Sequence, residues 1–170
     1  MKLVHKRSSV RLYKDTEVPD TAVEKVLEAA QQAPSACNIQ PVHFILIRAF
    51  EKKQELRAVY NNEWFINAPV IIAVCAEPGK AWKRGDGKNY SYVDAAIAME
   101  HIVLAAAELD LGTCWVGAFD VSAAVRVLGL PEGIEPVAFT PLGYPAEEGN
   151  AVKRKPLSEF VHRESFGHSY

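Results

Sequence analysis

The chain has 170 residues, so it has the size of a single domain that can bury about 70% of its unfolded surface without metals or disulfides. Its 49% hydrophobic and 24% charged residues exclude a disordered chain. The formal net charge of −2 argues against a general nucleic-acid-coating role.

The first predicted element is an amphipathic helix. Residues 21–24, Thr-Ala-Val-Glu, match a capping box in which Thr21 and Glu24 satisfy the first free amides of a helix. Apolar residues follow at helical spacing, and Pro34 ends the helix.

Two strands and a surface helix follow this first helix. Residues 42–47 form a short apolar run that predicts a strand, and residues 50–60 read as a charged surface helix. Residues 70–76 are rich in β-branched side chains between two prolines, which predicts a buried strand. Residues 79–92 are a polar loop with aromatic residues, and a loop of this length is either functional or disordered.

The second half opens on a long helix over residues 92–111, with Gly112 as its expected C-terminal stop. This helix is apolar almost all round, so it lies at the centre of the domain or packs on another subunit. The remaining predicted elements are a strand at 113–118, a helix at 122–128, a strand at 136–142 and a short helix at 157–163. Without repeats or linkers, residues 1–170 are expected to form one domain. The alternation of helices and strands alone favours a parallel α/β sheet.

Cysteine usage and hydropathy bear on the compartment. The three cysteines, Cys37, Cys75 and Cys114, cannot form a closed disulfide set, which favours a reducing compartment. The basic N-terminus has no apolar segment behind it, and the longest apolar run, residues 70–76, is far short of the roughly 20 residues that span a bilayer. We therefore expect a cytoplasmic protein that has no membrane partner.

Several common catalytic and binding motifs are missing from the sequence. There is no Rossmann GxGxxG after a strand and no GxxxxGK[ST] loop, so neither common phosphate cradle is present. There is also no HExxH, no zinc-like Cys/His spacing and no GxSxG elbow. Hydrolase and metalloenzyme functions therefore have little support, and no metal site is expected.

Two polar segments in the first quarter of the chain are suited to a flat, charged ligand. In the first, the guanidinium groups of Arg7 and Arg11 enclose Ser8 and Ser9, which suits a phosphate or a polar ring edge. The alternative is a solvated basic N-terminus. The second, residues 34–41, is a loop between two prolines that offers hydroxyl and amide groups; the alternative is a plain helix–strand turn. Its cysteine has no adjacent base in the sequence, which favours a packed thiol over a reactive one.

Two further segments lie in the second half. At residues 113–119, Gly117 would let the backbone approach a ring closely, although a buried strand with an incidental glycine explains it equally well. The basic run at residues 153–155 suits a phosphate, and a solvated charged face is the alternative.

Taken together and in this order, these segments resemble the FMN-dependent nitroreductase family over nearly the whole chain. The matching stretches are RSSVRLY at 7–13, PSACNIQPVHF at 34–44, NNEW at 61–64 with APV at 68–70, DAAIAME at 94–100, GTCWVGAF at 112–119 and RKPL at 154–157. The resemblance implies an α+β fold with a mixed central β-sheet flanked by helices, and an intertwined homodimer with an FMN at each side of the interface.

The resemblance also implies which residues contact FMN. The phosphate and the pyrimidine edge would be held by Arg7, Ser8, Ser9 and Arg11. The other subunit would contribute Pro34, Ser35, Ala36 and Asn38. The flavin edge and the ring near N5 would be met by Asn61, Val116 and Gly117, and the phosphate also by Arg154 and Lys155. Hydride would pass from NAD(P)H through flavin N5 to a nitroaromatic, quinone or similar acceptor by a ping-pong mechanism, so no catalytic side chain is expected.

Two departures from the family pattern loosen any inference about substrate: Ala36 replaces a second serine, and Val42 stands where tryptophan is common. Residues 79–92, with Trp82, are the candidate lid over the flavin. Alternatives to the general reductase are a specialised flavin reaction on the same fold (reductive dehalogenation, flavin breakdown or enone reduction), a non-catalytic flavin-binding dimer, and a dimeric interaction module without cofactor.

Overall fold

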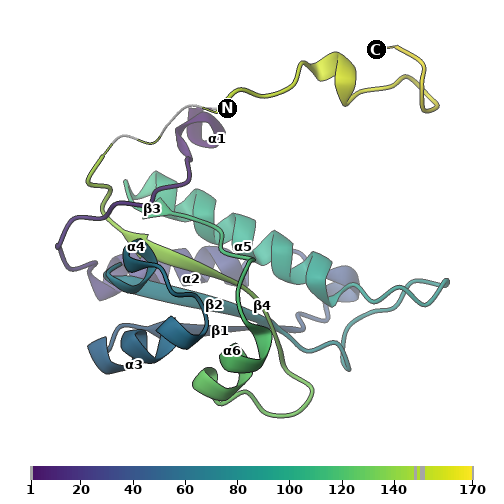
Figure 1. The fold of residues 1–170 in the computed structure, drawn as a ribbon. Helices are drawn as coiled ribbons and strands as arrows, with labels where there is room; N and C mark the ends of the chain where they lie inside the picture. The colour runs from purple at the N-terminus through teal and green to yellow at the C-terminus, as the bar shows by residue number, and fades with distance from the viewer. Residues whose placement is uncertain (1, 148, 150–151, 170) are drawn as a thin grey trace.

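A four-stranded antiparallel sheet organises the structure, a computed structural model that describes residues 2–147, 149 and 152–169 (Figure 1). The strands are β1 (Val42–Ile47), β2 (Val70–Ala76), β3 (Gly112–Thr113) and β4 (Glu135–Gly143), in the order β1-β2-β4-β3. Each neighbouring pair of these strands is antiparallel. The parallel component of the expected mixed sheet is a bridge between Ser9 and Thr113 at the β3 edge.

The parallel sheet suggested by the alternation of elements is therefore wrong. Between β1 and β2 lie α3 (Phe50–Glu55), the 3₁₀ turn η2 (Leu56–Ala58) and α4 (Glu63–Ile66). At 1.5 Å per residue the six residues of α3 rise about 9 Å, whereas a six-residue strand spans about 20 Å. These helices are too short to carry the chain back to the start of β1, so β2 enters the sheet from the opposite end.

The core has two parts, one on each face of the sheet. All seven residues of β2 are fully buried, and alternate side chains point to opposite faces. Val70, Ile72 and Val74 pack with α2 (Asp20–Gln31) and α5 (Ser91–Glu108), while Ile71 and Ala73 pack with η2, α4 and α6 (Val121–Leu128). The prediction of a buried strand at 70–76 is confirmed.

The capping box predicted at Thr21 is wrong. The helix α2 begins at Asp20, its N-cap is Pro19, and no side chain caps it. The backbone amides of Ala22 and Val23 donate to the carbonyl oxygen of Pro19 instead. The fixed φ of proline, here −58°, already suits the start of a helix, so Thr21 falls inside the first turn.

The helix α5 ends earlier than predicted, and Gly112 is not its stop. The chain leaves the helix through Asp110, which has a left-handed φ of 59°, and Gly112 begins β3. A Cβ at Gly112 would lie 2.8 Å from side-chain atoms of Val10. The glycine is therefore required by the close approach of the N-terminal segment to β3.

The other predicted elements are confirmed with changed bounds. The helix at α6 is capped by Asp120, whose carboxylate accepts the amide of Ala123 at 2.8 Å. The strand expected at 113–118 shrinks to β3 and a bridge between Val116 and Phe139. The final helix is only the 3₁₀ turn η3 (Leu157–Glu159), and a short α1 (Lys2–Lys6) was not predicted.

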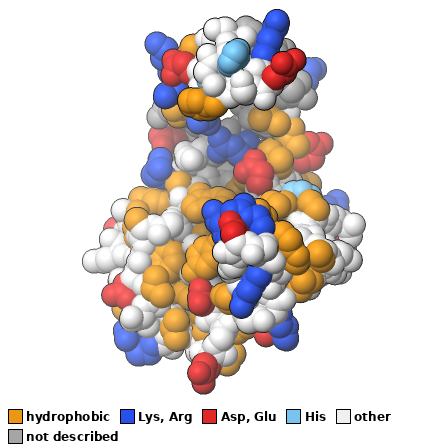
Figure 2. All heavy atoms as spheres, turned by 90° about the vertical axis from the view of Figure 1, so that its right-hand side faces the viewer, with side chains coloured by type: hydrophobic (Ala, Val, Ile, Leu, Met, Phe, Trp, Pro, Cys, Tyr) orange, Lys and Arg blue, Asp and Glu red, His pale blue; other side chains and the backbone are white. Residues whose placement is uncertain are grey.

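Two segments project from this body. Residues 82–90 form a small hairpin at the start of α5, with a bridge between Lys83 and Asn89 and the rings of Trp82 and Tyr90 4.8 Å apart (Figure 1). Figure 2 looks onto the end of the molecule that carries the hairpin and shows hydrophobic side chains gathered around it. Residues 152–169, the C-terminal arm, run away from the sheet (Figure 1). Within the described residues, no helix is long and apolar enough to cross a membrane.

Candidate functional site

The N-terminal segment is fixed along the edge of the sheet. The amide of Val10 donates to the carbonyl oxygen of Thr113 at 2.8 Å, and the Tyr13 hydroxyl donates to the carbonyl oxygen of Val10 at 2.6 Å. Burial raises the pKa of Tyr13 well above its usual value, so this phenol stays protonated and keeps donating. The backbone between Arg7 and Arg11 is thereby held next to β3.

A cationic cavity of about 420 Å³ lies around Arg7. Three cations (Lys6, Arg7 and Lys14), the Ser8 hydroxyl and two carboxylates (Asp110 and Glu147) line it, so positive charge is in excess. The Nζ of Lys6 is 2.6 Å from Oδ1 of Asp110, whereas Arg7 makes no ion pair with any residue in the described part of the chain. A half-buried guanidinium beside a serine hydroxyl is a donor set suited to a phosphate.

A second cavity, of about 460 Å³, lies around Arg11. The guanidinium carbon of Arg11 is 5.7 Å from the ring centre of Trp64, a cation–π contact that holds the long side chain in place. Asn62 lines this cavity, whereas the predicted contact Asn61 is exposed and accepts a 3.4 Å hydrogen bond from Arg57. The sequence analysis missed Asn62 and Trp64 as lining residues, although both belong to the motif that contains Asn61.

The strand after β3 offers backbone rather than reactive side chains. Val116 is buried and exchanges both backbone hydrogen bonds with Phe139, while Gly117 is exposed. Cys114 is buried, and burial raises the pKa of its thiol against the opposing effect of Arg11. Cys114 therefore remains a protonated thiol near neutral pH and is not a nucleophile.

The loop at residues 34–40 has an unusual backbone. Cys37, Asn38 and Gln40 have φ values of 54°, 55° and 56°, a left-handed region that residues other than glycine rarely adopt. Ser35 stabilises the turn because its Oγ accepts the amide of Gln40 at 2.9 Å. Strained backbone of this kind is concentrated at functional sites, which favours a binding role for the loop over a plain turn.

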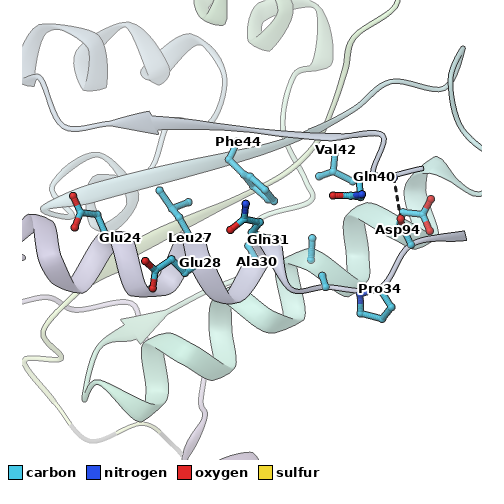
Figure 3. A pocket seen from close by; sticks show the side chains of 13 residues that line it. Glu24, Leu27, Glu28, Ala30, Gln31, Pro34, Gln40, Val42, Phe44 and Asp94 are labelled. Atoms are coloured by element: carbon cyan, nitrogen blue, oxygen red, sulfur yellow. Dashed lines mark hydrogen bonds between the residues drawn. The ribbon is translucent and has the colours of Figure 1, made fainter. Parts of the chain in front are cut away.

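Beside this loop runs a groove of about 540 Å³ between α2, β1 and the start of α5 (Figure 3). Leu27 and Phe44 form part of its apolar wall, and the carboxylates of Glu24, Glu28 and Asp94 border it. Asp94 reaches across to the loop, where its Oδ1 accepts the backbone amide of Ala36 at 2.9 Å. The sequence analysis quoted Asp94 only within a motif; an acidic residue in an apolar stretch of helix was the signal that could have singled it out.

The structure does not bring all predicted contacts together within one chain. The loop at 34–40 is tied to Asp94 at the start of α5, whereas Lys6, next to Arg7, is paired with Asp110 beyond its end. From Asp94 to the end of α5 at Glu108 the helix rises about 21 Å. The loop and the arginine segment are therefore too far apart to contact the same ring from one chain.

Arg154 and Lys155 lie on the C-terminal arm, and both are exposed. The Nζ of Lys155 is 3.2 Å from Oε2 of Glu159, within the arm itself. Among the described residues, no hydrogen bond or ion pair joins either side chain to the segment that carries Arg7 and Arg11. The structure thus leaves these two predicted phosphate contacts outside the cavity.

The sequence matches one protein family and several known proteins over most of its length. The Nitroreductase family model matches residues 4–60 and 49–144. A protein of Archaeoglobus fulgidus that carries the name NADH dehydrogenase/NAD(P)H nitroreductase is 35% identical over 157 residues, which cover 87% of this chain and 86% of that protein. An FMN reductase [NAD(P)H] of Bacillus subtilis is 28% identical and covers 93% and 70% of the two chains. Human iodotyrosine deiodinase 1 is 24% identical, covering 94% and 66%.

Solved structures agree with this grouping. A nitroreductase family protein from Clostridium difficile 630 superposes with a TM-score of 0.90 at 34% identity, covering 96% of this chain and 97% of that one. An FMN-dependent nitroreductase from C. difficile R20291 gives a TM-score of 0.83 at 29% identity, covering 98% and 100%.

Proposed function

Because this chain belongs to the nitroreductase family, we propose that it is an oxidoreductase that binds FMN and takes its electrons from NAD(P)H. Residues 1–170 act as one FMN-binding domain in the cytoplasm. Bound FMN would supply the redox chemistry, a hydride transfer from NAD(P)H to a small-molecule acceptor such as a nitroaromatic or a quinone by a ping-pong sequence. The protein's own residues bind and orient the cofactor and need supply no nucleophile.

The observation that carries this proposal is the cationic cavity beside β3. Arg7 and Ser8 both line it, and Arg7 has no carboxylate partner in the described part of the chain, so its guanidinium group can bind the FMN phosphate, together with Ser8 and Ser9. Arg11, held over Trp64, lines the second cavity, where the pyrimidine edge would sit. A cation at that edge stabilises negative charge on the reduced ring and raises its potential.

The geometry favours a site that is shared between two copies of the chain. Because the loop at 34–40 and the arginine segment are about 21 Å apart along α5, a second copy must supply Pro34, Ser35, Ala36 and Asn38 if both groups contact one flavin. Exposed apolar side chains on α5, including Tyr92 and Val93, give such a copy a surface to cover.

The C-terminal arm supports the same homodimer. Leu157, Phe160 and Phe166 are exposed on it by 69%, 63% and 91%, far more than isolated apolar residues of a folded body. An arm that embraces a second copy would bury these side chains. It would also carry Arg154 and Lys155 toward a phosphate, which their own chain does not do.

The remaining predicted contacts fit as backbone and edge contacts. Val116 and Gly117 present main chain next to the sheet, where a flat ring can approach closely because Gly117 has no side chain. Asn61 is exposed, with its Oδ1 accepting a hydrogen bond from Arg57, so its amide nitrogen is the group left to meet a flavin carbonyl.

A specialised reaction on the same scaffold is the second candidate. One relative, human iodotyrosine deiodinase 1, is named for a dehalogenation. Its name favours reductive dehalogenation over flavin breakdown or enone reduction. The hairpin at residues 82–90 would form the lid that selects the acceptor. A non-catalytic flavin-binding dimer is the outcome if bound flavin is never reduced.

The visible absorption spectrum of gently purified protein tests the proposal, recorded before and after anaerobic addition of NADH and, separately, NADPH. We expect a flavin spectrum that is bleached by at least one of the two nucleotides. A flavin spectrum that neither nucleotide bleaches would support the binding role instead. Protein that is colourless and does not take up added FMN would refute the assignment of the cavity.

A further inference from the structure

Asp94 is a buried carboxylate that the function described above does not use. It lies in the first turn of α5 and is only 2% exposed. Its Oδ1 accepts the amide of Ala36 at 2.9 Å, and its Oδ2 is buried without a hydrogen-bond partner in the described part of the chain. Burying a carboxylate costs desolvation free energy unless hydrogen bonds or opposite charges offset it. A carboxylate kept in this position with a single partner therefore suggests that its contact with Ala36 has a function.

The loop that Asp94 contacts depends on outside support. Cys37, Asn38 and Gln40 occupy left-handed backbone conformations that persist only where the surroundings enforce them. The side-chain hydrogen bonds of Ser35 and Gln40 stay within the loop. The carbonyl oxygen of Gln40 accepts the amide of Val42 at the start of β1, which directly follows the loop. Among the described residues, the bond from Ala36 to Asp94 is the one that ties residues 34–40 to an element distant in the sequence.

The position of Asp94 makes it a rigid anchor. The start of α5 is fixed because Oδ1 of Asn89 accepts the amide of Ser91 at 2.9 Å, while the Asn89 amide donates to the carbonyl oxygen of Pro78 at 2.7 Å. The partial positive charge at a helix N-terminus stabilises a carboxylate in the first turn. Figure 3 shows Asp94 at the end of the groove, facing the loop.

We propose that Asp94 is a positioning residue for the flavin site: it holds the loop at residues 34–40 in the shape that contacts the FMN bound mainly by the second copy. The inference rests on the proposed function, because the loop needs this shape only if it meets a flavin. Pre-ordering the loop lowers the conformational entropy that is lost when the flavin binds, so the effect appears in FMN affinity.

The first test measures the rate of hydrogen exchange at the amide of Ala36 in flavin-free protein, which reports whether the bond to Asp94 is formed. Asp94→Ala is expected to speed this exchange about tenfold or more, because the acceptor is gone. Asp94→Asn keeps a carbonyl oxygen that can accept the same amide and is expected to retain most of the protection. Ser91→Ala is the matched control: Ser91 is equally buried one turn earlier, and its hydroxyl also lacks a hydrogen-bond partner among the residues that the structure describes.

The second test measures FMN binding by fluorescence titration of the same variants. Asp94→Ala should weaken binding about tenfold or more, while Asp94→Asn and Ser91→Ala stay within about threefold of the unmodified protein. The visible spectrum of bound flavin should shift in Asp94→Ala and return to normal in Asp94→Asn, which keeps both the volume of the side chain and the acceptor oxygen. The exchange of the Ala36 amide separates loss of the bond from loss of packing.

Removing the donor instead of the acceptor keeps the proposal testable if Asp94→Ala does not fold. Ala36→Pro abolishes the same hydrogen bond, and Ser35 before it already has φ −133° and ψ 157°, the extended conformation that a proline requires of its predecessor. Ala36→Pro should weaken FMN binding about as much as Asp94→Ala, and combining the two should add little, since both remove one interaction.

Unchanged exchange at Ala36 in Asp94→Ala, or FMN affinity equal to that of Ser91→Ala, would overturn the proposal. So would equal losses of affinity in Asp94→Ala and Asp94→Asn with the Ala36 amide still protected, because the charge rather than the bond would then matter. Failure of the proposed function gives a different result. The unmodified protein would then bind no FMN, while the exchange rate of the Ala36 amide would still show whether Asp94 holds the loop.

Discussion

Replacing Arg7 with alanine distinguishes a cavity that binds the FMN phosphate from a basic surface that does not. Arg7 is half-buried and has no carboxylate partner in the described part of the chain, so its charge is available to a ligand. A charge-assisted hydrogen bond contributes about 1.5–3 kcal/mol. Losing it in Arg7→Ala should raise the dissociation constant of FMN about 10- to 150-fold.

Lys6 provides the comparison within the same cavity. Its ammonium group lies 2.6 Å from a carboxylate oxygen of Asp110, so its charge is already compensated. We expect Lys6→Ala to change FMN affinity less than about threefold, the range of an exposed ion pair. Arg126→Ala, on the exposed side of α6, controls for the loss of one positive charge from the whole protein.

The assay is quenching of FMN fluorescence on titration with apoprotein at about 0.1 M salt, where distant charges are screened. Of the three variants, Arg7→Ala should have the lowest affinity for FMN. If Arg7→Ala binds FMN within twofold of the unmodified protein, or if Lys6→Ala is the more damaging change, the phosphate is held elsewhere.

Three further predictions concern packing, thiols and the hairpin. Gly143→Ala should lower stability by about 1–3 kcal/mol in urea unfolding, since a Cβ would lie 2.7 Å from the Pro69 ring; an unchanged midpoint would show that this contact relaxes freely. At pH 8 a thiol reagent should modify Cys37 but not Cys75 in folded protein. Burial raises the pKa of Cys75 to about 11, above its usual 9. The protonated thiol therefore stabilises the folded state fully below pH 9, and this contribution is lost as the pH rises toward 11. Rapid labelling of Cys75 at pH 8 would show that its thiol is not buried. Trp82→Ala should alter turnover with at least one acceptor if the hairpin is a lid, and unchanged kinetics with every acceptor tested would remove that role.

The individual elements were predictable because their signals are local. The buried strand at 70–76 follows from β-branched residues between prolines, and the helix predicted at 122–128 is observed at Val121–Leu128. Strand direction was not predictable from alternation, because it depends on whether the intervening helices are long enough to return the chain. Gly112 reads as a helix stop until the structure places Val10 against it.

The candidate site was likewise predictable in its local segments but not in their arrangement in space. The segments around Arg7 and residues 34–40 were identified by their residue types, and both have the expected polar groups. That they lie at opposite ends of α5 depends on tertiary structure, which no spacing in the sequence encodes. Asp94 was missed as an anchor because its partner is a backbone amide, which leaves no trace in the choice of side chains.

The central claim, a flavin site built from two copies of the chain, is tested most directly by a mixed dimer. One chain carries Arg7→Ala with Arg11→Ala, the other carries Ala36→Trp, and the two are co-expressed with different tags so that the mixed dimer is isolated. Each variant alone should retain no FMN. In the mixed dimer one of the two flavin sites holds both defects and the other none, so about half the FMN content of the unmodified dimer should return. A mixed dimer without FMN would contradict the shared site.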